Sequence, residues 1–420
     1  MAPLTDPVLA TPSGTNTVKG AGKDTGQQQP ATAAASGTRL AKAKRVVIKI
    51  GSALLVDETT GGVRTDWLDA LCGDVARLRA QGTEVILVSS GAIAVGRGPL
   101  GLEPGRMKLG DKQAAAAIGQ IRLAHAYRNA MAPHGIEVAQ ILLTLDDSEN
   151  RRRYLNARTT LDSLLRLGAV PVVNENDTVT TMEIRFGDND RLSARVAEMA
   201  GAEVLVLLSD IDGLYSADPR FDPDARHIAE VPALTPEILA MAGKAQTSVG
   251  TGGMVTKLEA ARIAMGAGCA MVITRGTQAH PLSRLLDGAQ ATWFLPAADP
   301  GTARKRWLRG GLKAEGVLHL DAGAARALSR GRSLLPAGVT AVEGRFQRGA
   351  AVHICGPDGT LIGKGLVTYP AEEARKIMGR KSGDIESLLG YVGREVLVHR
   401  DDLVLMSEDS ETDHTEGNGS

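Results

Sequence analysis

Residues 46–52 have the sequence VVIKIGS, in which a run of β-branched residues holds Lys49 and leads into Gly51. A short run that is apolar on both faces is typical of a strand covered by helices on both sides of a parallel sheet. A lysine at that place either extends to the rim of the sheet as a structural residue or points into a crevice as a clamp for phosphate. The run by itself leaves both interpretations open.

Similar apolar runs alternate with longer helical patterns over the first two thirds of the chain. Strands are expected at Val46–Ile50, Glu84–Val88, Val138–Leu142, Val170–Val173, Val204–Leu208 and Met271–Thr274. Helices are expected at Trp67–Ala80, Lys112–Met131, Tyr154–Leu167, Leu192–Ala200 and Lys257–Met265, with a polar insertion over residues 178–186. Strands separated by helices imply right-handed crossovers and a mostly parallel sheet. We therefore predict one α/β domain over residues 41–298.

The remaining segments differ in composition. Residues 1–40 contain almost no large apolar groups, which predicts a disordered extension that is neither a signal nor a transit peptide. Residues 313–405 carry short apolar segments punctuated by Gly and Pro, which predict a small β-rich domain. A linker is expected over residues 299–312 and an acidic tail over residues 406–420.

The linker contains a basic stretch, Arg304 to Arg309, which is more typical of a solvated connection than of a binding patch. The predicted sheet is complete by about Leu295, before this stretch begins. We therefore expect a chain that ends near Thr302 to fold without the β-rich domain.

Composition excludes several classes of protein. The 420 residues include 48 Lys and Arg against 48 Asp and Glu, so no overall positive field attracts nucleic acid or a membrane surface. Aromatic residues make up only 3% of the chain, which argues against platforms for stacking bases. Cys72, Cys269 and Cys355 lie far apart without metal-ligand spacing, which indicates neither disulfides nor zinc and fits the cytoplasm. No apolar run is long enough for a membrane helix.

Polar residues follow several of the predicted strands, at the edge where ligands of doubly wound sheets bind. These clusters are Lys49–Ser52, Ser89–Ile93, Asn174–Asp177, Gly187–Asp190 and Ser209–Asp210. Asn and Asp are also common in turns and helix caps, so Asp188 or Asn189 capping the next helix is the structural alternative. The two dense Asn/Asp clusters exceed what capping requires, because amides can hold both ends of a zwitterion while carboxylates orient lysines or a metal ion.

A glycine-rich loop, Gly250–Lys257, opens another predicted helix. Its glycines allow backbone N–H groups to approach phosphate oxygens, and Lys257 adds a full charge at the positive end of the helix dipole. A lysine there is unfavourable unless an anion is present, which favours a binding role. The loop is neither a Walker A motif nor the Gly-x-Gly-x-x-Gly of dinucleotide-binding folds.

In their joint order these strings resemble the amino acid kinase family, over about residues 41–405. The matching strings are Val47–Ser52, Ser90–Ala94, Asn174–Asp177, Gly187–Ala194 and Gly250–Lys257. The resemblance implies an αβα sandwich with a mostly parallel sheet, the amino acid kinase fold, followed by a small PUA-like domain. It also implies transfer of the γ-phosphoryl group of ATP to the side-chain carboxylate of L-glutamate, the first step of proline biosynthesis.

The resemblance also implies roles for individual residues. Lys49 and Lys257 would flank the transferring phosphoryl group, with Asp190, or alternatively Asp188, organising the two ammonium groups. Ser90, Asp177 and Asn189 match positions that bind glutamate. The nucleotide would contact Lys49, Ser209, Asp210, Thr251, Gly252, Gly253, Met254, Val255, Thr256 and Lys257. Mg²⁺ is expected to arrive bound to ATP, so no residue is assigned as its ligand.

Further partners follow from the same resemblance: L-proline as a feedback inhibitor, a second copy of the chain in a homo-oligomer, and no membrane. RNA binding by the PUA-like domain is the competing hypothesis, since such domains often contact RNA. Residues 313–402 carry 13 Lys and Arg against 11 Asp and Glu, with Phe346, Tyr369 and Tyr391 as the aromatics. This surface lacks an evident basic stripe, so RNA binding is not favoured.

Overall fold

The computed structural model describes residues 37–57, 59–103, 107–179, 189–243, 253–310 and 312–406. Most of the predicted extension and of the predicted acidic tail therefore lies outside the described residues. Residues 37–42 are helical, and the Leu40 side chain among them is fully buried. The folded part of the chain thus includes residues at the end of the predicted extension. In the described ranges, no helix combines the length and apolar character that a bilayer span requires.

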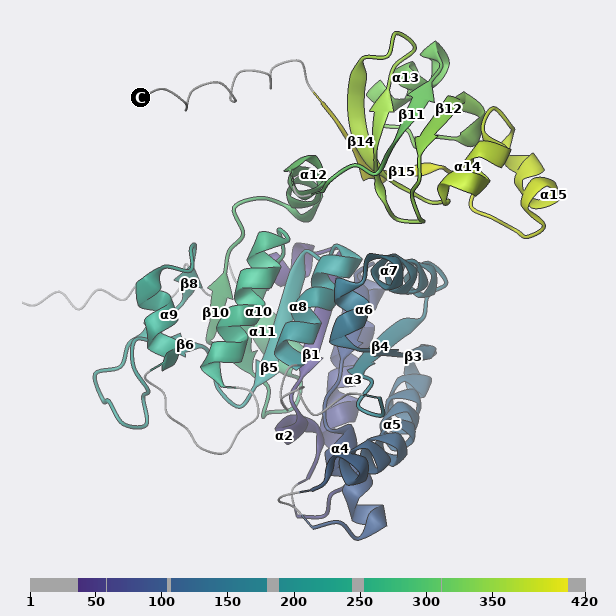
Figure 1. Ribbon diagram of the computed structural model, residues 1–420. Helices are drawn as coiled ribbons and strands as arrows, with labels where there is room; N and C mark the ends of the chain where they lie inside the picture. Colours follow the sequence, from purple (N-terminus) through teal and green to yellow (C-terminus); the bar gives the residue numbers. More distant parts are fainter. Residues whose placement is uncertain are drawn as a thin grey trace, which may run out of the picture.

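A mostly parallel sheet of eight strands forms the centre of the first domain (Figure 1). Its order is β3-β4-β2-β1-β5-β9-β10-β8, and β10 runs antiparallel to β9. The strands are β1 (Arg45–Ile50), β2 (Glu84–Val88), β3 (Val138–Leu143), β4 (Val170–Glu175), β5 (Val204–Ser209), β8 (Glu230–Val231), β9 (Ala270–Arg275) and β10 (Ala291–Phe294). The predicted strands of this domain are all present, so the α/β prediction is confirmed.

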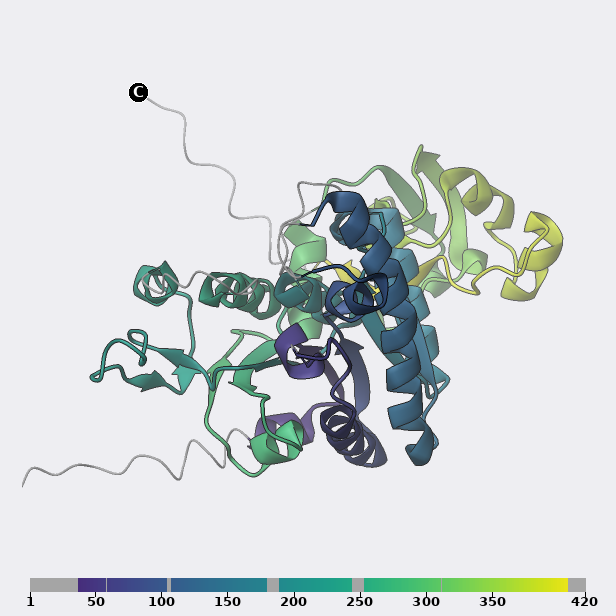
Figure 2. The same cartoon turned by 90° about the horizontal axis from the view of Figure 1, so that it is seen from below.

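Helices cover both faces of this sheet, as Figures 1 and 2 show from two directions. One apolar core lies under α3 (Thr65–Ala80), α5 (Leu109–Met131) and α11 (Pro281–Leu286). A second core lies under α7 (Arg151–Arg166), α8 (Asn189–Ala200) and α10 (Met254–Gly266). The structure is therefore the three-layer αβα sandwich expected from the sequence.

Shorter elements connect these layers. They are α2 (Ser52–Leu55), α4 (Ala92–Arg97), η1 (Gly98–Leu100), η2 (Ala132–His134), α6 (Leu145–Glu149), α9 (Pro236–Gly243) and the two-stranded sheet of β6 (Leu214–Tyr215) and β7 (His227–Ile228). Helix α4 packs against α5 without intervening side chains: a Cβ on Gly119 would lie 1.7 Å from the carbonyl oxygen of Ala92. This contact holds the start of α4, just after β2, close to α5.

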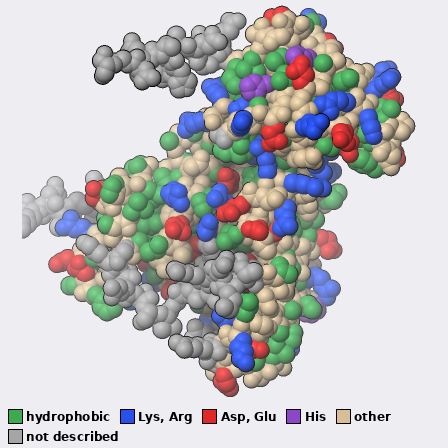
Figure 3. Space-filling view, in the orientation of Figure 1, with side chains coloured by type: hydrophobic (Ala, Val, Ile, Leu, Met, Phe, Trp, Pro, Cys, Tyr) green, Lys and Arg blue, Asp and Glu red, His purple; other side chains and the backbone are tan. Residues whose placement is uncertain are grey.

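The second domain is built on a five-stranded sheet of order β12-β11-β13-β14-β15. Its elements are β11 (Gly316–Leu320), α13 (Ala322–Ser329), η3 (Pro336–Gly338), β12 (Val339–Gly344), β13 (Ala351–Cys355), β14 (Leu361–Val367), α14 (Ala371–Ile377), η4 (Ser382–Asp384), α15 (Ile385–Leu389) and β15 (Val398–Leu405). It has its own apolar core, so the predicted β-rich fold is confirmed. Figure 3 shows its Lys and Arg side chains interspersed with Asp and Glu on the visible face.

Helix α12 (Pro300–Gly310) occupies most of the segment predicted as a linker. Its Leu308 is fully buried in a cluster with Ala351, Leu366 and Val404 of the second domain. Asp402 of β15 pairs with Arg304 of α12 and also with Arg158 of α7, at 2.6 Å from Arg158 Nη1. The interpretation of Arg304 as part of a solvated connection is therefore wrong, because burial against β15 gives this arginine a specific partner.

Candidate active site

Two lysines from different elements meet on one buried aspartate at the carboxyl ends of the strands. Lys49 Nζ lies 2.7 Å from Asp190 Oδ1, and Lys257 Nζ lies 3.2 Å from Asp190 Oδ2. The Asp190 side chain is fully buried, while Lys49 and Lys257 retain 11% and 6% exposure of their side chains. The two ammonium groups are therefore held at a fixed place with a small opening to solvent.

The alternation of β1 explains why Lys49 reaches this place. Val46, Ile48 and Ile50 belong to the core beneath α3, whereas Val47 belongs to the core beneath α8 and α10. Successive side chains of a strand point to opposite faces, so Lys49 shares the face of Val47. Asp190 in the first turn of α8 and Lys257 in the first turn of α10 lie on that same face.

Opposing effects set the charge of Asp190. Burial raises the pKa of this carboxyl, but the nearby ammonium groups of Lys49 and Lys257 outweigh burial and leave the pKa below its ordinary value. The Thr256 hydroxyl donates a further hydrogen bond of 3.0 Å to Asp190 Oδ2. At neutral pH the Asp190 carboxylate therefore lies between the two cations Lys49 and Lys257.

A second pair of predicted residues meets beside this centre. Asn189 Nδ2 donates to Ser90 Oγ at 2.7 Å and to the backbone carbonyl of Ser89 at 3.3 Å. The side-chain oxygen of Asn189 is buried and finds no hydrogen-bond donor within the described ranges. Gly91 follows with φ +95°, and a Cβ there would lie 2.9 Å from Val56 Cγ2. The turn after β2 therefore requires glycine at position 91. The side-chain oxygen of Asn189 remains available to accept a hydrogen bond from a ligand.

Asp177 lies in the turn that follows β4. Burial raises the pKa of its carboxyl to about 6. Strands β4, β2 and β1 are consecutive neighbours, so the turns that carry Asp177 and Ser90 follow adjacent strands at the same edge of the sheet. Asp188, the alternative partner of the lysines, lies outside the described residues.

The predicted nucleotide-contacting residues lie on the other side of β1. Ser209 ends β5 and donates to Asp210 Oδ1 at 2.9 Å. Gly253 precedes α10, and a Cβ there would meet nothing within 4 Å. Met254, Val255, Thr256 and Lys257 form the first turn of α10. Thr251 and Gly252 lie outside the described residues.

The side chains at the site also indicate how a divalent cation could be held. In the part of the chain that the structure describes, no three His, Cys, Asp or Glu side chains are grouped as a metal site. Both oxygens of Asp190 already face ammonium groups. Among the described residues, Mg²⁺ would therefore depend mainly on phosphate oxygens of a bound nucleotide rather than on a cage of protein ligands.

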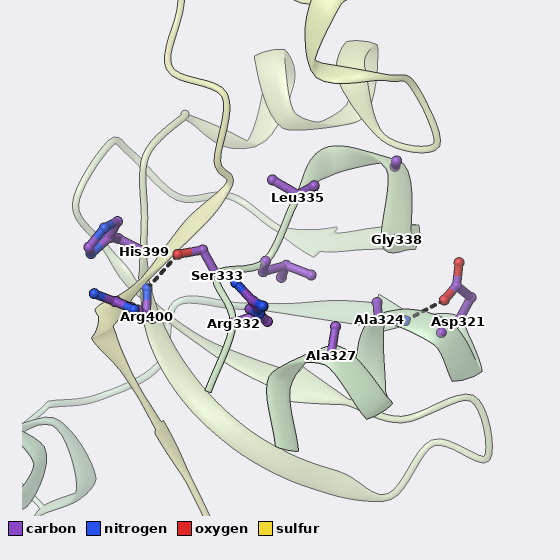
Figure 4. A pocket seen from close by; sticks show the side chains of 12 residues that line it. Asp321, Ala324, Ala327, Arg332, Ser333, Leu335, Gly338, His399 and Arg400 are labelled. Atoms are coloured by element: carbon purple, nitrogen blue, oxygen red, sulfur yellow. Dashed lines mark hydrogen bonds between the residues drawn. The ribbon is translucent and has the colours of Figure 1, made fainter. Parts of the chain in front are cut away.

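A separate cavity of about 690 Å³ lies in the second domain, far along the chain from these residues (Figure 4). Two of its polar side chains already serve the domain itself: Asp321 Oδ1 caps α13 by accepting from the Ala324 N–H at 2.7 Å, and Ser333 Oγ accepts from the Arg400 N–H at 3.0 Å. The remaining lining is largely apolar. Arg332, His399 and Arg400 also line it, but the carboxylate that pairs with His399 and Arg400 is Asp401, which is exposed rather than buried like Asp190.

The sequence did not point to every residue at the site. Gln120 and Tyr127 of α5 are buried and bond to the turns that contain Asp177 and Ser90. The available signal was their spacing of seven residues, which places both on one face of a helix whose other inward residues are apolar. The sequence predicts that Thr256 contacts nucleotide, but it does not predict the hydrogen bond from Thr256 to Asp190.

Comparisons with known proteins identify the families that the two domains match. The model of the amino acid kinase family matches residues 44–275, and the model of the PUA domain matches residues 316–389. Glutamate 5-kinase of Rhodospirillum rubrum is 69% identical over 361 residues, which cover 86% of this chain and 96% of that relative. Glutamate 5-kinase of Paramagnetospirillum magneticum is 64% identical over 366 residues, or 87% of this chain and 99% of that relative.

Among solved structures, carbamate kinase from Giardia lamblia bound to AMP-PNP has a TM-score of 0.44 and 18% identity, covering 61% of this chain and 99% of that chain. The amino acid kinase model spans more than half of the chain, and the two glutamate 5-kinases match it at high identity over nearly their full length. The chain belongs to the amino acid kinase family and, within it, to the glutamate 5-kinases that carry a C-terminal PUA domain.

Proposed function

We propose that this protein transfers the γ-phosphoryl group of ATP to the side-chain carboxylate of L-glutamate, giving L-glutamyl 5-phosphate and ADP, as the first step of proline biosynthesis. The observation that carries the proposal is the pair of lysines held on buried Asp190 at the carboxyl ends of the strands. The names of the relatives supply the identity of the acceptor.

In this reaction a carboxylate oxygen of glutamate forms a bond to the γ-phosphorus, and the bond from that phosphorus to the bridging oxygen of ADP breaks. The acceptor is already an anion at neutral pH, so no general base is needed. The work left to the protein is alignment of two anions and neutralisation of the charge that builds up between them. Lys49 and Lys257 supply two preorganised cations for this purpose, and Asp190 keeps their ammonium groups in place.

The groups around Asn189 suit the amino-acid end of glutamate. The buried oxygen of Asn189 can accept from the substrate ammonium, and the Asp177 carboxylate can pair with that same charge. The Ser90 hydroxyl and the turn at Gly91 offer donors for the α-carboxylate. On the other side of β1, the first turn of α10 would hold the ATP phosphates, because N–H groups at a helix N-terminus favour anions.

Mg²⁺ is part of this proposal as the ion that accompanies ATP. When bound, it neutralises phosphate charge in the transition state. Asp210 is exposed beside the predicted nucleotide position and is the described carboxylate best placed to approach such an ion. Lys49 and Lys257 would contact the oxygens of the transferring phosphoryl group directly.

The decisive experiment compares acceptors. ATP turnover is measured with L-glutamate, L-aspartate, N-acetylglutamate and carbamate, and the acyl phosphate is trapped with hydroxylamine. The proposal predicts turnover that depends on glutamate and a hydroxamate of matching amount. Equal or higher turnover with any of the other acceptors would overturn the assignment of the substrate.

The pH dependence of glutamate use is expected to report the titration of Asp177. Since its pKa is raised to about 6, kcat/KM for glutamate should fall as pH drops through this value. The slope should approach about tenfold per pH unit on the acid side, because a protonated carboxyl no longer attracts the substrate ammonium. The measurement is a kcat/KM profile for glutamate between pH 5 and 8, at saturating ATP and Mg²⁺.

Asp177→Asn provides the matched comparison, because it keeps the size of the side chain and removes the titration. Its kcat/KM should be lower at pH 8, and the inflection near pH 6 should be absent. Titration of ATP affects both proteins equally and cancels in their ratio. A variant that keeps the wild-type inflection would show that another group is responsible.

The second domain is expected to be dispensable for the chemistry. The structure shifts the cut from the position near Thr302, which would divide α12, to Ala298, because α12 packs on the second domain. A chain of residues 1–298 should retain turnover of glutamate and ATP, since all the residues assigned to the site precede residue 260. Asp402→Ala in the full chain weakens the same contact without removing a domain and serves as the control. A fragment that unfolds cooperatively on heating but lacks turnover would contradict this expectation.

The remaining parts of the proposal follow from the resemblance: feedback inhibition by L-proline, a homo-oligomeric assembly and a cytoplasmic location. Free, buried Cys72, Cys269 and Cys355 fit a reducing compartment. A proline titration of turnover and light scattering of the intact protein test the first two. RNA binding by the second domain is not part of the proposal, and a salt-titrated RNA-binding assay would reveal it.

A further inference from the structure

Helix α5 carries two polar side chains on a buried face that is otherwise apolar or small. The buried residues of this face include Ala115, Ala116, Leu123, Ala130 and Met131. Gln120 is 5% exposed and Tyr127 is fully buried. Buried polar groups in a helix–sheet contact are costly unless they are fully bonded, and apolar side chains would fill the same space. The partners of these two residues therefore indicate why they are polar.

Gln120 forms hydrogen bonds to the last two residues of β4, Asn174 and Glu175. Its Nε2 donates to the backbone carbonyl of Glu175 at 3.0 Å, and its Oε1 accepts from Asn174 Nδ2 at 3.2 Å. The Asn174 side-chain oxygen accepts in turn from the Glu175 N–H at 2.9 Å. Two residues further on lies Asp177. The amide of Gln120 thus fixes the direction in which the chain leaves the sheet toward Asp177.

Tyr127 forms the corresponding hydrogen bond at the end of the neighbouring strand, β2. Its hydroxyl donates to Ser89 Oγ at 3.0 Å, directly before Ser90. Ser89 in turn donates its backbone N–H to the Val173 carbonyl at 2.8 Å, which ties the end of β2 to β4. One helix face therefore bonds to both turns that are assigned to the amino-acid substrate.

We propose that Gln120 is a positioning residue for the glutamate site, supported by Tyr127: it holds the turn after β4 so that Asp177 meets the substrate ammonium. This inference rests on the proposed function. It differs from a purely structural role because the effect is confined to one substrate. Helix α5 covers one face of the sheet, whereas α10, whose first turn carries Lys257, covers the opposite face.

The test compares Gln120→Leu with wild type. Displacing a group that binds the substrate weakens binding of that substrate by roughly tenfold or more. The KM for glutamate should therefore rise about 10-fold. The KM for ATP should change less than about twofold, because no ATP-binding residue is touched. Gln140→Leu is the matched control: Gln140 is an exposed residue of β3 that donates to Gln120 Oε1 at 3.3 Å and does not bond to Glu175. It should leave both KM values near wild type.

Gln120→Glu keeps the shape of the side chain and adds a readout that packing alone would not give. Only the protonated carboxyl of this variant can donate to the Glu175 carbonyl, and the ionised form repels it. Burial at this position, where Gln120 is 5% exposed, raises the pKa of an introduced carboxyl above its ordinary value of about 4.3. The ratio of the variant's glutamate KM to that of wild type should therefore rise with pH between pH 5 and pH 8. Thermal denaturation of each variant accompanies the kinetics, and this second variant decides the matter if Gln120→Leu does not fold.

Three outcomes overturn the inference. A glutamate KM near wild type in Gln120→Leu would show that the turn does not need this bond. Equal rises in the KM values for glutamate and ATP would show a general loss of packing, and a ratio independent of pH in Gln120→Glu would exclude the donated bond. Absence of glutamate-dependent turnover in the wild-type protein would instead overturn the proposed function, and the positioning role with it.

Discussion

Replacing Lys49 or Lys257 with alanine is expected to lower kcat by about 10²-fold or more at saturating ATP, Mg²⁺ and glutamate. Each substitution removes one of the two cations that Asp190 holds beside the proposed path of the phosphoryl group. Charge accumulates on the transferring oxygens only in the transition state, so the loss should appear in kcat more than in the KM for glutamate. Steady-state kinetics with each substrate varied in turn make the measurement.

A third lysine provides the control for loss of a buried lysine as such. Lys364 of β14 is 7% exposed and donates to the backbone carbonyl of Arg309 of α12 at 3.3 Å. Lys364→Ala should lower the melting temperature and leave kcat near wild type. Near-wild-type kcat in either Lys49→Ala or Lys257→Ala would refute the assignment of these residues as the cations that act on the phosphoryl group.

Much of this arrangement could be predicted because it depends on local patterns. The period of two in β1 places Lys49 opposite Ile48 and Ile50, and the glycine loop before α10 marks a helix start that suits an anion. Positions at the carboxyl ends of parallel strands converge whatever the exact strand order. These patterns place the loops of Lys49, Asp190 and Lys257 at the same end of the sheet. The pairing of both lysines with one aspartate was implied by the family resemblance, with Asp188 as the alternative to Asp190.

Other features depend on strand order and on contacts between distant segments, which no local pattern contains. Gln120 bonds to Glu175 because β4 lies beside β2 and α5 crosses both. The spacing of Gln120 and Tyr127 shows that they share a helix face but does not identify their partners. Helix α12 was mistaken for a connection because its basic residues look solvated until Asp402 is placed beside Arg304. Long-range ion pairs and the close approach of α4 to α5 are thus the parts that required the structure.

Asp190→Asn is expected to lower kcat by about 10²-fold or more, although it removes neither lysine. The amide has nearly the same shape but no charge, so two buried ammonium groups lose their common counterion and are no longer held in a fixed geometry. Removing one partner of a buried ion pair typically costs about 3–5 kcal/mol of stability. The melting temperature at pH 7 should therefore also fall.

The pH dependence of this loss has a definite sign. Because the pKa of Asp190 is lowered in the folded protein, its ion pairs stabilise the fold above the ordinary pKa of an aspartate, about 3.9, and this contribution is lost as pH falls through the lowered value. Wild type and Asp190→Asn should thus differ most in stability near neutral pH and converge in strong acid.

ATP distinguishes an organising role of Asp190 from simple damage to the fold. In Asp190→Asn, nucleotide phosphates can neutralise Lys49 and Lys257 in place of the lost carboxylate. Saturating ATP with Mg²⁺ should therefore raise the melting temperature of the variant by more than it raises that of wild type, since a ligand stabilises the folded state according to its affinity for it. Turnover should stay low even then, because the phosphates attract the two ammonium groups but do not orient them toward the acceptor. A variant with near-wild-type kcat, or one that ATP stabilises less than wild type, would refute the view that Asp190 organises the two cations.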